Sequence, residues 1–588
     1  MGDRELSEVS NRGMRAIEWI GAVGAIAIIA ALLSAPAGLY ALKTPTTVNL
    51  LSLVFTFGFF VALCLVVRNR AALIVVGAFV LILNLIEIVS LLSFGGLVSL
   101  GGLAAVLYVD PTEAREFLGD HAGAIVGGAA VAPLFVALVW LEARLLRVSR
   151  PVRLGVAAVA VVVPATLLSA ELVRTGNPED VYLPTRYVEH FVAYLGVNPL
   201  TGTLSGIAAT LAARHELAGQ HDRRAVVRFE AERTAAAPER ELWVVVVGES
   251  SRRANWSLFG YGRHTNPRLS RVPGLTAFRD AVSPATTTSS SVPQSFYFPT
   301  EARDGSSQVT GSFVSAFRAA GYETFWLSNQ GTHRSAVGGP IALLMQEAER
   351  VATTNYGFWN SVLDEALIAE FDRALADPTP RKLIVVHTLG SHTNYRQRYP
   401  ADWIAKPLGP DVRDVHAFGE MTEADAQIVD DYDRTILYTD WLLGELLGRL
   451  ARADLHGGLV YFSDHGQRLY DDASHAKGHG FGDLKAMDVE IPLLVWLSET
   501  YGRARPETAA AIAANATRPA STVDMAASLL DLAGFRVKQI APGPSFAAAG
   551  YDVGPRRVLM TDGRLLPYGG TAVTQNMPAT DTPASTTH

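Results

Sequence analysis

Five long apolar segments in the first third of the chain limit its fold more than any other feature of the sequence. They cover residues 17–42, 50–67, 72–92, 122–141 and 154–173. Each is about as long as the roughly 20 apolar residues that an α-helix needs to cross a bilayer. The first segment is too long for a cleavable signal peptide, and four similar segments follow it. The sequence therefore predicts a polytopic α-helical membrane domain with five spans over residues 1–174.

The basic residues between these segments predict the orientation of the membrane domain. Arg68 and Arg70 lie between the second and third segments, and four arginines at 144–153 lie between the fourth and fifth. The other two connections carry Lys43 and a mostly acidic stretch at 110–120. Because cationic loops stay on the cytoplasmic side, we expect a cytoplasmic N-terminus in a bacterial inner membrane. Five spans then place the rest of the chain in the periplasm.

Two polar residues, Asn84 and Glu87, interrupt the third apolar segment. A carboxylate inside a membrane is costly unless it faces protein, water or a lipid headgroup. We favour a hydrogen bond between helices near the membrane interface. The alternative is a contact to a lipid headgroup or to the soluble part of the chain.

The composition argues against one class of partner and against disulfide cross-links. The net charge of −7 argues against nucleic acid as a partner. The single cysteine, Cys64, lies inside the second apolar segment. The sequence therefore excludes an intrachain disulfide and a metal site built from cysteines. A large extracytoplasmic domain can nevertheless fold without disulfides.

From residue 241 onward, short apolar runs alternate with helical patterns. The runs 243–247, 324–328, 382–387, 459–463 and 491–497 predict strands, and the stretches 311–320, 361–376, 423–453 and 522–534 predict helices. This alternation is typical of an α/β domain whose mostly parallel sheet is covered by helices on both faces. We expect that domain over 241–567, amphipathic bridging helices and a linker over 175–240, and a disordered tail over 568–588.

Candidate metal ligands follow two of the predicted strands. Asp464 and His465 come directly after the strand at 459–463, and Glu249 follows the strand at 243–247. In open α/β sheets, ligands bind at the carboxyl ends of the strands. Oxygen and nitrogen ligands together suit zinc. An adjacent Asp and His are equally well explained as a capping residue and a surface residue, but the second strand with an acidic end favours a metal site.

Several further motifs occur in order after residue 240. They are Val-Val-Gly-Glu-Ser-Ser-Arg at 246–252, Gly-Tyr at 260–261 with Arg-His-Thr-Asn-Pro at 263–267, Thr-Thr-Thr-Ser-Ser-Ser-Val-Pro at 286–293, His-Thr-Leu-Gly-Ser-His at 387–392, Tyr-Asp at 432–433 with Ile-Leu-Tyr-Thr-Asp at 436–440, Tyr-Phe-Ser-Asp-His-Gly at 461–466, Gly-His-Gly at 478–480 and Ile-Pro at 491–492. Together with the five spans, these motifs resemble the phosphoethanolamine transferase family, which belongs to the sulfatase and alkaline phosphatase superfamily. The resemblance covers nearly the whole chain.

The resemblance implies one zinc ion, with a second left open, and the ligands Glu249, Thr288, Asp464 and His465. It also implies that Thr288 is the nucleophile. A divalent cation supports this role because it lowers the pKa of a hydroxyl that is a poor nucleophile on its own. From the residues alone, any of the six hydroxyl side chains at 286–291 could be an ordinary loop residue. The family spacing selects Thr288, with Thr287 and Ser289 as alternatives.

The resemblance also implies roles for residues around the zinc site. His392 and His479 match family histidines that contact the phosphoryl group or the acceptor, where one could protonate the leaving alkoxide and the other activate the acceptor hydroxyl. His475 competes with His479, which the Gly-His-Gly pattern favours. Asn329 and Gln330 resemble a polar pair that binds the phosphate or the acceptor, although they could equally be solvated loop residues. Four other histidines after residue 240 are expected to be structural: His264, His333, His387 and His416.

Three departures from the family pattern bear on the acceptor. Gln294 stands where lipid A-modifying members have a cysteine, Ser250 stands where threonine is common, and Gln467 stands where many members have glutamate. These departures indicate the disulfide-free branch that modifies core sugars or periplasmic glucans, rather than the lipid A branch.

The function implied by the resemblance is transfer of phosphoethanolamine from phosphatidylethanolamine to a glycan or lipid-linked sugar of the cell envelope, through a phospho-threonine intermediate. The glycan is lipopolysaccharide core, lipid A or periplasmic glucan. The alternatives are a phosphoglycerol transferase and a membrane-bound phosphodiesterase or sulfatase-type hydrolase. A sulfatase of the formylglycine type is disfavoured because no Cys/Ser-x-Pro-x-Arg motif occurs in the expected α/β domain, from residue 241 onward. A catalytically inactive membrane scaffold is disfavoured because all four ligand types are present at the expected positions.

Overall fold

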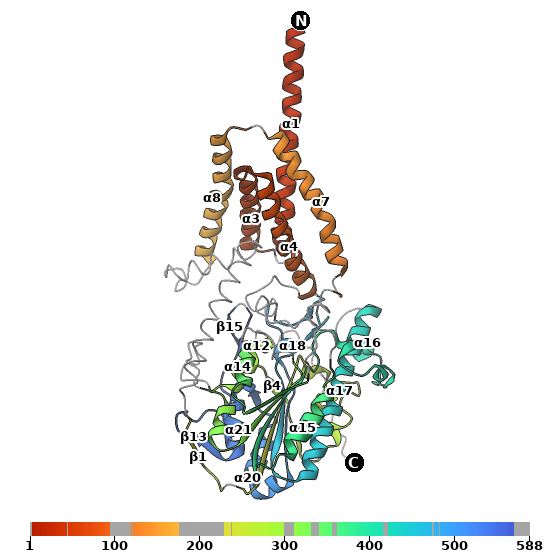
Figure 1. Ribbon diagram of the computed structural model, residues 1–588, viewed down its shortest axis with the longest axis vertical. Coiled ribbons are helices and arrows are strands. Elements are labelled where there is room, and N and C mark those ends of the chain that lie inside the picture. Colours follow the sequence, from red (N-terminus) through yellow and green to blue (C-terminus); the bar gives the residue numbers. More distant parts are fainter. Residues whose placement is uncertain are drawn as a thin grey trace. The chain divides into compact units, whose positions relative to one another are not determined.

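The structure is a computed structural model that describes residues 3–43, 45–94, 119, 122–146, 148–175, 229–236, 238–298, 311–330, 340–354, 362–415, 421–472, 475–480, 483–561 and 563–569. These residues divide into a helical unit up to residue 175 and an α/β unit from residue 229 (Figure 1). The amphipathic bridging helices expected after residue 175 and nearly all of the expected disordered tail lie outside the described residues. So do His333 and His416.

The helical unit contains the five predicted spans. Its helices are α1 (Asp3–Leu33), α2 (Ala35–Lys43), α3 (Thr47–Val66), α4 (Arg70–Phe94), α7 (Ala122–Leu145) and α8 (Arg150–Thr175). All of them except α2 are long and apolar enough to cross a membrane. Within the unit, α3 packs mainly against α8, and α7 packs against α1 and α4. By length and composition, these five helices confirm the prediction of five spans.

The first apolar segment, predicted as one helix, is instead broken into two. α1 ends at Leu33, and Ser34 forms a turn before α2 begins. The reason is Pro36, which has no backbone N–H to donate to Leu32 and whose ring clashes with the preceding turn. Asn84 of α4 donates from Nδ2 to the carbonyl oxygens of Leu32 (3.0 Å) and Leu33 (3.2 Å). The favoured hydrogen bond between helices is therefore confirmed for Asn84.

Basic residues join the helices at the end of the unit where α3 and α7 finish and α4 and α8 begin. Arg68, between α3 and α4, forms an ion pair of 3.2 Å with Glu142 of α7. Arg153 of α8 donates to the carbonyl oxygen of Leu65 in α3 at 3.1 Å. Arg68 and Arg153, two of the arginines used to predict the orientation, therefore lie at the same end of the helical unit.

A seven-stranded sheet forms the centre of the α/β unit. Its spatial order is β3 (Leu275–Phe278), β11 (Leu493–Leu497), β8 (His456–Ser463), β2 (Glu241–Gly248), β7 (Arg381–His387), β5 (Glu323–Ser328) and β6 (Arg350–Thr353). β11 is antiparallel to both of its neighbours, and the other neighbouring strands are parallel. The predicted mostly parallel sheet is confirmed. The two edge strands, β3 and β6, were not predicted because they are short and largely not fully buried.

Helices cover both faces of this sheet, as predicted. α15 (Ala366–Ala376) and α17 (Glu423–Ala453) pack on one face (Figure 1). The other face carries α12 (Thr288–Phe296), α13 (Phe313–Ala319), α14 (Pro340–Met345) and α21 (Met525–Ala533). Side chains of β2 alternate between the two cores, so the strand is apolar on both faces. α17 has the predicted bounds because Thr422 caps it in a capping box with Asp425.

Smaller elements surround this framework. Four two-stranded sheets among the described residues pair β1 (Ala231–Arg233) with β13 (Phe535–Val537), β4 (Asp280–Val282) with β12 (Pro519–Ser521), β9 (Arg468–Leu469) with β10 (Lys477–Gly478), and β14 (Arg556–Leu559) with β15 (Leu565–Tyr568). The remaining α-helices are α16 (Val412–Val415), α18 (Ala486–Val489), α19 (Glu499–Ala504) and α20 (Pro506–Asn515).

Candidate metal centre and active site

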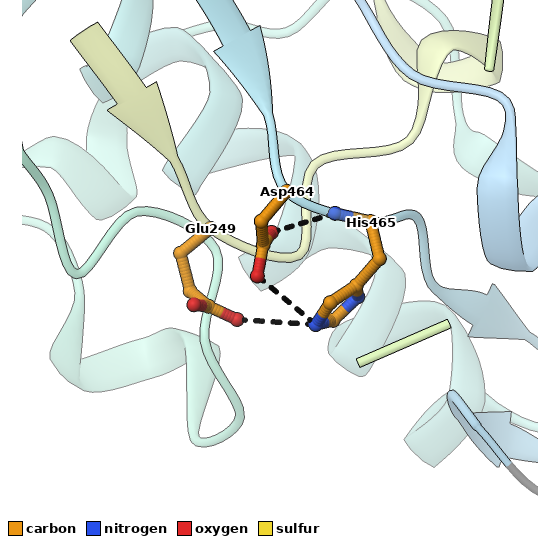
Figure 2. Close-up of side chains that lie close together, drawn as sticks. All are labelled: Glu249, Asp464 and His465. Atoms are coloured by element: carbon orange, nitrogen blue, oxygen red, sulfur yellow. Dashed lines mark hydrogen bonds and ion pairs between the residues drawn. The ribbon is translucent and has the colours of Figure 1, made fainter. Parts of the chain in front are cut away.

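The carboxyl ends of β2 and β8 bring three predicted ligands together. The strands are parallel neighbours with Gly248 beside Ser463, so Glu249 and Asp464 begin their loops side by side. One ligand atom from each of Glu249, Asp464 and His465 lies within 4.8 Å of the other two. Figure 2 shows the three side chains converging from the two strand ends. His465 Nε2 is 3.5 Å from Glu249 Oε1 and 3.3 Å from Asp464 Oδ2, and all three residues are buried.

Thr288 joins this group from the first residue of α12. Its hydroxyl oxygen lies 3.2 Å from Glu249 Oε2 and 3.3 Å from His465 Nε2. The structure describes all six hydroxyl residues at 286–291, and among them only the Thr288 hydroxyl lies within hydrogen-bond distance of these two ligands. α12 is nine residues long, and the free N–H groups and dipole at a helix N-terminus stabilise negative charge. An anionic oxygen or a phosphoryl group on Thr288 is therefore favoured at this position.

The donor atoms of the site suit a divalent cation. His465 Nδ1 donates to the carbonyl oxygen of Gly466 at 2.8 Å, which leaves the lone pair of Nε2 facing the carboxylates. Asp464 Oδ1 accepts from the backbone N–H of Ser250 at 2.9 Å and of His465 at 2.7 Å. Asp464 Oδ2, in contrast, is buried and accepts no hydrogen bond from the described residues. A buried carboxylate oxygen needs a cation or a proton, and this set of oxygen and nitrogen atoms fits zinc.

The pKa values of two neighbouring histidines of the site, His465 and His479, shift in opposite directions. Burial opposes protonation of His465, but the carboxylates of Asp464 and Glu249 outweigh burial and raise its pKa. Burial and then the neighbouring His465 lower the pKa of His479 well below its usual value, and His392 lowers it further. His479 is therefore neutral at physiological pH.

His479 lies directly over the ligand histidine. The ring centroids of His465 and His479 are 3.8 Å apart, with 29° between the ring planes. His479 Nδ1 donates to the carbonyl oxygen of Thr286 at 2.9 Å, so its Nε2 is the nitrogen that can accept a proton. The structure thus places His479 against the metal site, with His392 close enough to influence it.

His475 turns toward a different part of the domain. Its Nε2 lies 3.2 Å from Asp425 at the start of α17, and its ring stacks on Tyr470 at 4.6 Å. The backbone at His475 is left-handed, with φ of 49°. Of the two competing histidines, the geometry favours His479 for a role in the chemistry.

Gln330 contacts a candidate ligand rather than open solvent. Its Nε2 donates to Glu249 Oε2 at 2.9 Å and to the carbonyl oxygen of Thr388 at 3.0 Å. The side chain is about nine-tenths buried, with 9% exposed. Gln330 therefore orients the Glu249 carboxylate, which is a role that the sequence did not predict.

Asn329, unlike Gln330, hydrogen-bonds to residues outside the candidate metal site. Its Nδ2 donates to Val362 O at 2.7 Å and to Asp364 Oδ1 at 2.8 Å, while its Oδ1 accepts from Thr354 at 2.7 Å. Since both ends of the amide have protein partners, the predicted contact of Asn329 with substrate gains no support from its geometry.

Asp364 is a buried residue near the site that sequence reasoning missed. Its carboxylate accepts from the backbone N–H of Leu389 and of Gly390, each at 2.8 Å, and so holds the loop that carries His392. Gly390 has φ of 50°, and a Cβ there would lie 2.9 Å from the backbone nitrogen of Glu249, so the close approach requires glycine. The sequence signal available was the Gly390 in His-Thr-Leu-Gly-Ser-His, because it implies a tight loop against another backbone.

Two buried ion pairs fix the segment that runs from His465 toward His479. Arg252 donates to both oxygens of Asp471, at 2.7 and 2.6 Å. Arg468 donates from Nε to Asp488 Oδ1 at 2.8 Å and forms a second bond to the other oxygen. The loop that follows β8 is therefore tied to the loop that follows β2.

Comparison with known families and sequences adds two findings. The profile of the sulfatase family matches residues 241–535, which is half of the chain. The phosphoethanolamine transferase EptC of Escherichia coli O18:K1:H7 is 30% identical over 341 residues, which is 55% of this chain and 58% of that protein. This chain thus aligns with somewhat less than two thirds of its curated relative.

Two solved structures share the fold. The C-terminal periplasmic domain of EptC from Escherichia coli, in a complex with Zn, is 28% identical with a TM-score of 0.53, and covers 58% of this chain and 95% of that one. The integral membrane protein lipooligosaccharide phosphoethanolamine transferase A from Neisseria meningitidis is 19% identical with a TM-score of 0.64, and covers 88% of this chain and 97% of that one. The second likeness extends the similarity in fold to the helical unit.

Proposed function

The chain belongs to the sulfatase family, and from this premise we propose that it is a membrane-bound phosphoethanolamine transferase. The donor is phosphatidylethanolamine, and the acceptor is a hydroxyl of a cell-envelope glycan or lipid-linked sugar. The observation that carries the proposal is the position of the Thr288 hydroxyl, 3.2 Å from Glu249 and 3.3 Å from His465 at a helix N-terminus. The relative aligned above is named as a phosphoethanolamine transferase, which supports this choice of transferred group.

Four residues would hold a zinc ion in this proposal: Glu249, Thr288, Asp464 and His465. Support comes from the buried Oδ2 of Asp464, which accepts no hydrogen bond from the described residues, and from the Zn complex of the EptC domain. A bound zinc ion would act as a Lewis acid that favours the ionised Thr288 hydroxyl and takes up charge on a phosphoryl oxygen. We propose one ion at these residues.

The transfer would proceed in two displacements at phosphorus. In the first, the Thr288 oxygen attacks the phosphorus of phosphatidylethanolamine, its hydroxyl proton leaves, and the bond to the diacylglycerol oxygen breaks. That oxygen takes up a proton, and phosphoethanolamine remains on Thr288. In the second, an acceptor hydroxyl loses its proton and attacks the same phosphorus, the bond to Thr288 breaks, and the Thr288 oxygen regains a proton as the hydroxyl. The N-terminus of α12 stabilises the phosphoryl oxygens in both steps.

His479 and His392 are the proposed proton carriers. His479 is neutral, and its Nδ1 is committed to Thr286, so its Nε2 is free of a proton as a general base requires. We assign to His479 the proton of the acceptor hydroxyl and to His392 the proton of the diacylglycerol oxygen. This division follows from the tautomer of His479, because His392 is the remaining histidine beside it.

The proposed location is the bacterial inner membrane, with a cytoplasmic N-terminus and the α/β unit in the periplasm. The five apolar helices and the periplasmic origin of the EptC domain support this location. Membrane anchoring would raise the effective concentration of a lipid donor around the site. Because the chain has a single cysteine, we propose a core sugar or a periplasmic glucan as acceptor ahead of lipid A.

Mass spectrometry of the full-length protein tests the proposal. The protein, in nanodiscs of phosphatidylethanolamine with zinc, would be digested, and the peptide that contains residues 286–291 would be weighed and fragmented. We expect phosphoethanolamine on Thr288. Thr288→Ala should abolish the adduct, whereas Thr287→Ala and Ser289→Ala should retain it.

Two outcomes of this experiment would contradict the proposal. An adduct that persists in Thr288→Ala would exclude Thr288 as the nucleophile. An adduct that forms only in phosphatidylglycerol nanodiscs, with the mass of phosphoglycerol, would identify the protein as a phosphoglycerol transferase.

A further inference from the structure

Ser250, which directly follows the candidate ligand Glu249, has an unusual backbone. Its φ of 53° lies in the left-handed region, although it is not a glycine. The residue is 1% exposed. A buried serine adopts this conformation only when its surroundings fix it. The contacts of Ser250 show what this conformation achieves.

Ser250 contacts both candidate carboxylate ligands. Its backbone N–H donates to Asp464 Oδ1 at 2.9 Å, and its hydroxyl donates to Glu249 Oε1 at 2.7 Å. The first bond leaves Asp464 Oδ2 as the oxygen that faces His465, and the second sets the rotation of the Glu249 carboxylate. A change of Ser250 to an ordinary φ would redirect its side chain, which donates to Glu249, and its carbonyl group.

Tyr432 of α17 stabilises the turn at Ser250 through two hydrogen bonds to its backbone. Its hydroxyl donates to the carbonyl oxygen of Ser250 at 2.7 Å and accepts from the backbone N–H of Arg252 at 2.8 Å. Tyr432 is fully buried, and its ring packs edge-on against Tyr395 at 5.0 Å. One hydroxyl therefore satisfies a backbone acceptor and a backbone donor on the two sides of the left-handed turn.

We propose that Ser250 and Tyr432 form a positioning pair that presets the carboxylates of Glu249 and Asp464 for the metal ion. Neither residue supplies a metal ligand itself. Groups that orient metal ligands commonly change metal affinity 10- to 100-fold when they are removed. The inference rests on the proposed function, because the ion in question is the zinc ion of that proposal.

Zinc affinity of the full-length protein tests the inference without any measurement of catalysis. Zinc would be removed with a chelator from protein in detergent and titrated back in competition with a chromophoric chelator. We expect Tyr432→Phe to weaken zinc binding about 10-fold or more, since the Ser250 carbonyl and the Arg252 N–H both lose their partner. Ser250→Ala, which removes only the bond to Glu249, should weaken binding several-fold.

Tyr438→Phe is the matched control. Tyr438 lies on the same helix and is 2% exposed, but its hydroxyl contacts Glu365 at 3.2 Å instead of the turn. We expect this variant to bind zinc within two-fold of the wild-type affinity. The effects of Ser250→Ala and Tyr432→Phe should be non-additive in the double variant, because the two residues act on one turn. A merely structural tyrosine would show no such coupling.

The outcomes separate this inference from the proposed function. If the wild-type protein binds no zinc, both are wrong. If the wild type binds zinc and Tyr432→Phe keeps its affinity, only the positioning role is wrong. If Tyr432→Phe fails to fold, as judged by the melting curve of the zinc-free protein, the affinity of Ser250→Ala decides, and an unchanged value overturns the inference.

Discussion

At the scale of single residues, the buried His387 ties the stability of the α/β unit to pH. It ends β7 and is fully buried, and neither ring nitrogen has a hydrogen-bond partner among the described residues. Burial lowers its pKa to about 4, compared with about 6.5 in an unfolded chain. The unfolded state therefore binds more protons between these values, so His387 makes stability fall as the pH drops from about 6.5 to 4.

The expected size of this effect is at most about 1.4 kcal/mol for each pH unit in that window. We expect His387→Gln, which cannot titrate, to show a shallower decline of the apparent melting temperature between pH 6.5 and 4.5. The curves would be recorded on zinc-free protein so that metal release does not contribute. Parallel curves for the wild type and the variant would show that His387 is not the group responsible.

Gln330 supplies a second prediction at this scale. Replacing it by leucine removes the donors to Glu249 Oε2 and to Thr388 O. The Glu249 carboxylate then loses one of the bonds that orient it, and we expect zinc affinity to fall about 10-fold. Competition with a chelator measures this, with Gln346→Leu as the control because Gln346 is exposed. Equal affinities in the two variants would assign Gln330 no role in orienting Glu249.

At the scale of elements, α17 is joined to the loop after β2 by the carboxylate of Asp433. Its oxygens accept from Asn255 at 2.6 Å, Tyr261 at 2.8 Å and Arg263 at 2.6 Å, and Asp433 is fully buried. Asp433→Ala leaves these donors unpaired, although Asp430 still pairs with Arg263 at 2.7 Å. We expect a loss of about 3 kcal/mol in the free energy of unfolding.

An exposed ion pair of the same helix provides the comparison. Asp372, which is half exposed, pairs with Arg449 of α17 at 2.7 Å, and Asp372→Ala should cost about 0.5 kcal/mol or less. Unfolding of the α/β unit in urea, followed by tryptophan fluorescence, measures both variants. Similar losses in the two variants would mean that Asp433 does not hold the two elements together.

The junction of α1 and α2 gives a prediction for the helical unit. Asn84→Leu removes the donor to the carbonyl oxygens of Leu32 and Leu33, and we expect it to destabilise the unit by about 1 kcal/mol. Pro36→Ala lets α1 continue, so that its own N–H groups can satisfy these carbonyls. The loss caused by Asn84→Leu should therefore shrink in the Pro36→Ala background. The aggregation temperature in detergent would be measured for the full-length wild type, for both single variants and for the double variant. An equal loss caused by Asn84→Leu in both backgrounds would contradict this account.

At the scale of the whole molecule, ligand binding should couple the metal site to stability. The site joins loops that follow β2 and β8 with the start of α12, so a bound ion cross-links segments far apart in sequence. Zinc at about 100 times its dissociation constant should stabilise the folded state by about 2.7 kcal/mol. We expect an added excess of zinc to raise the apparent melting temperature of the wild type, and Asp464→Ala to abolish the increase. A rise of equal size in that variant would place the stabilising zinc elsewhere.

The sequence alone determined the features that depend on local pattern. Apolar length was sufficient for the five spans, and buried apolar runs located the five inner strands of the sheet. The residues just after two of those strands were sufficient to find Glu249, Asp464 and His465. The edge strands β3 and β6 were not predicted because partly exposed strands of four residues have little apolar pattern.

Only the tertiary structure decided which side chains contact one another around the site. Tyr432 lies 182 residues from Ser250, and Gln330 lies 81 residues from Glu249, so no local pattern pairs them. The parallel register of β2 and β8 decided that Glu249 and Asp464 lie side by side. The packing of α17 against the sheet then brought Tyr432 beneath the left-handed turn. Contacts of this kind depend on how separate elements pack, which no single stretch of the sequence specifies.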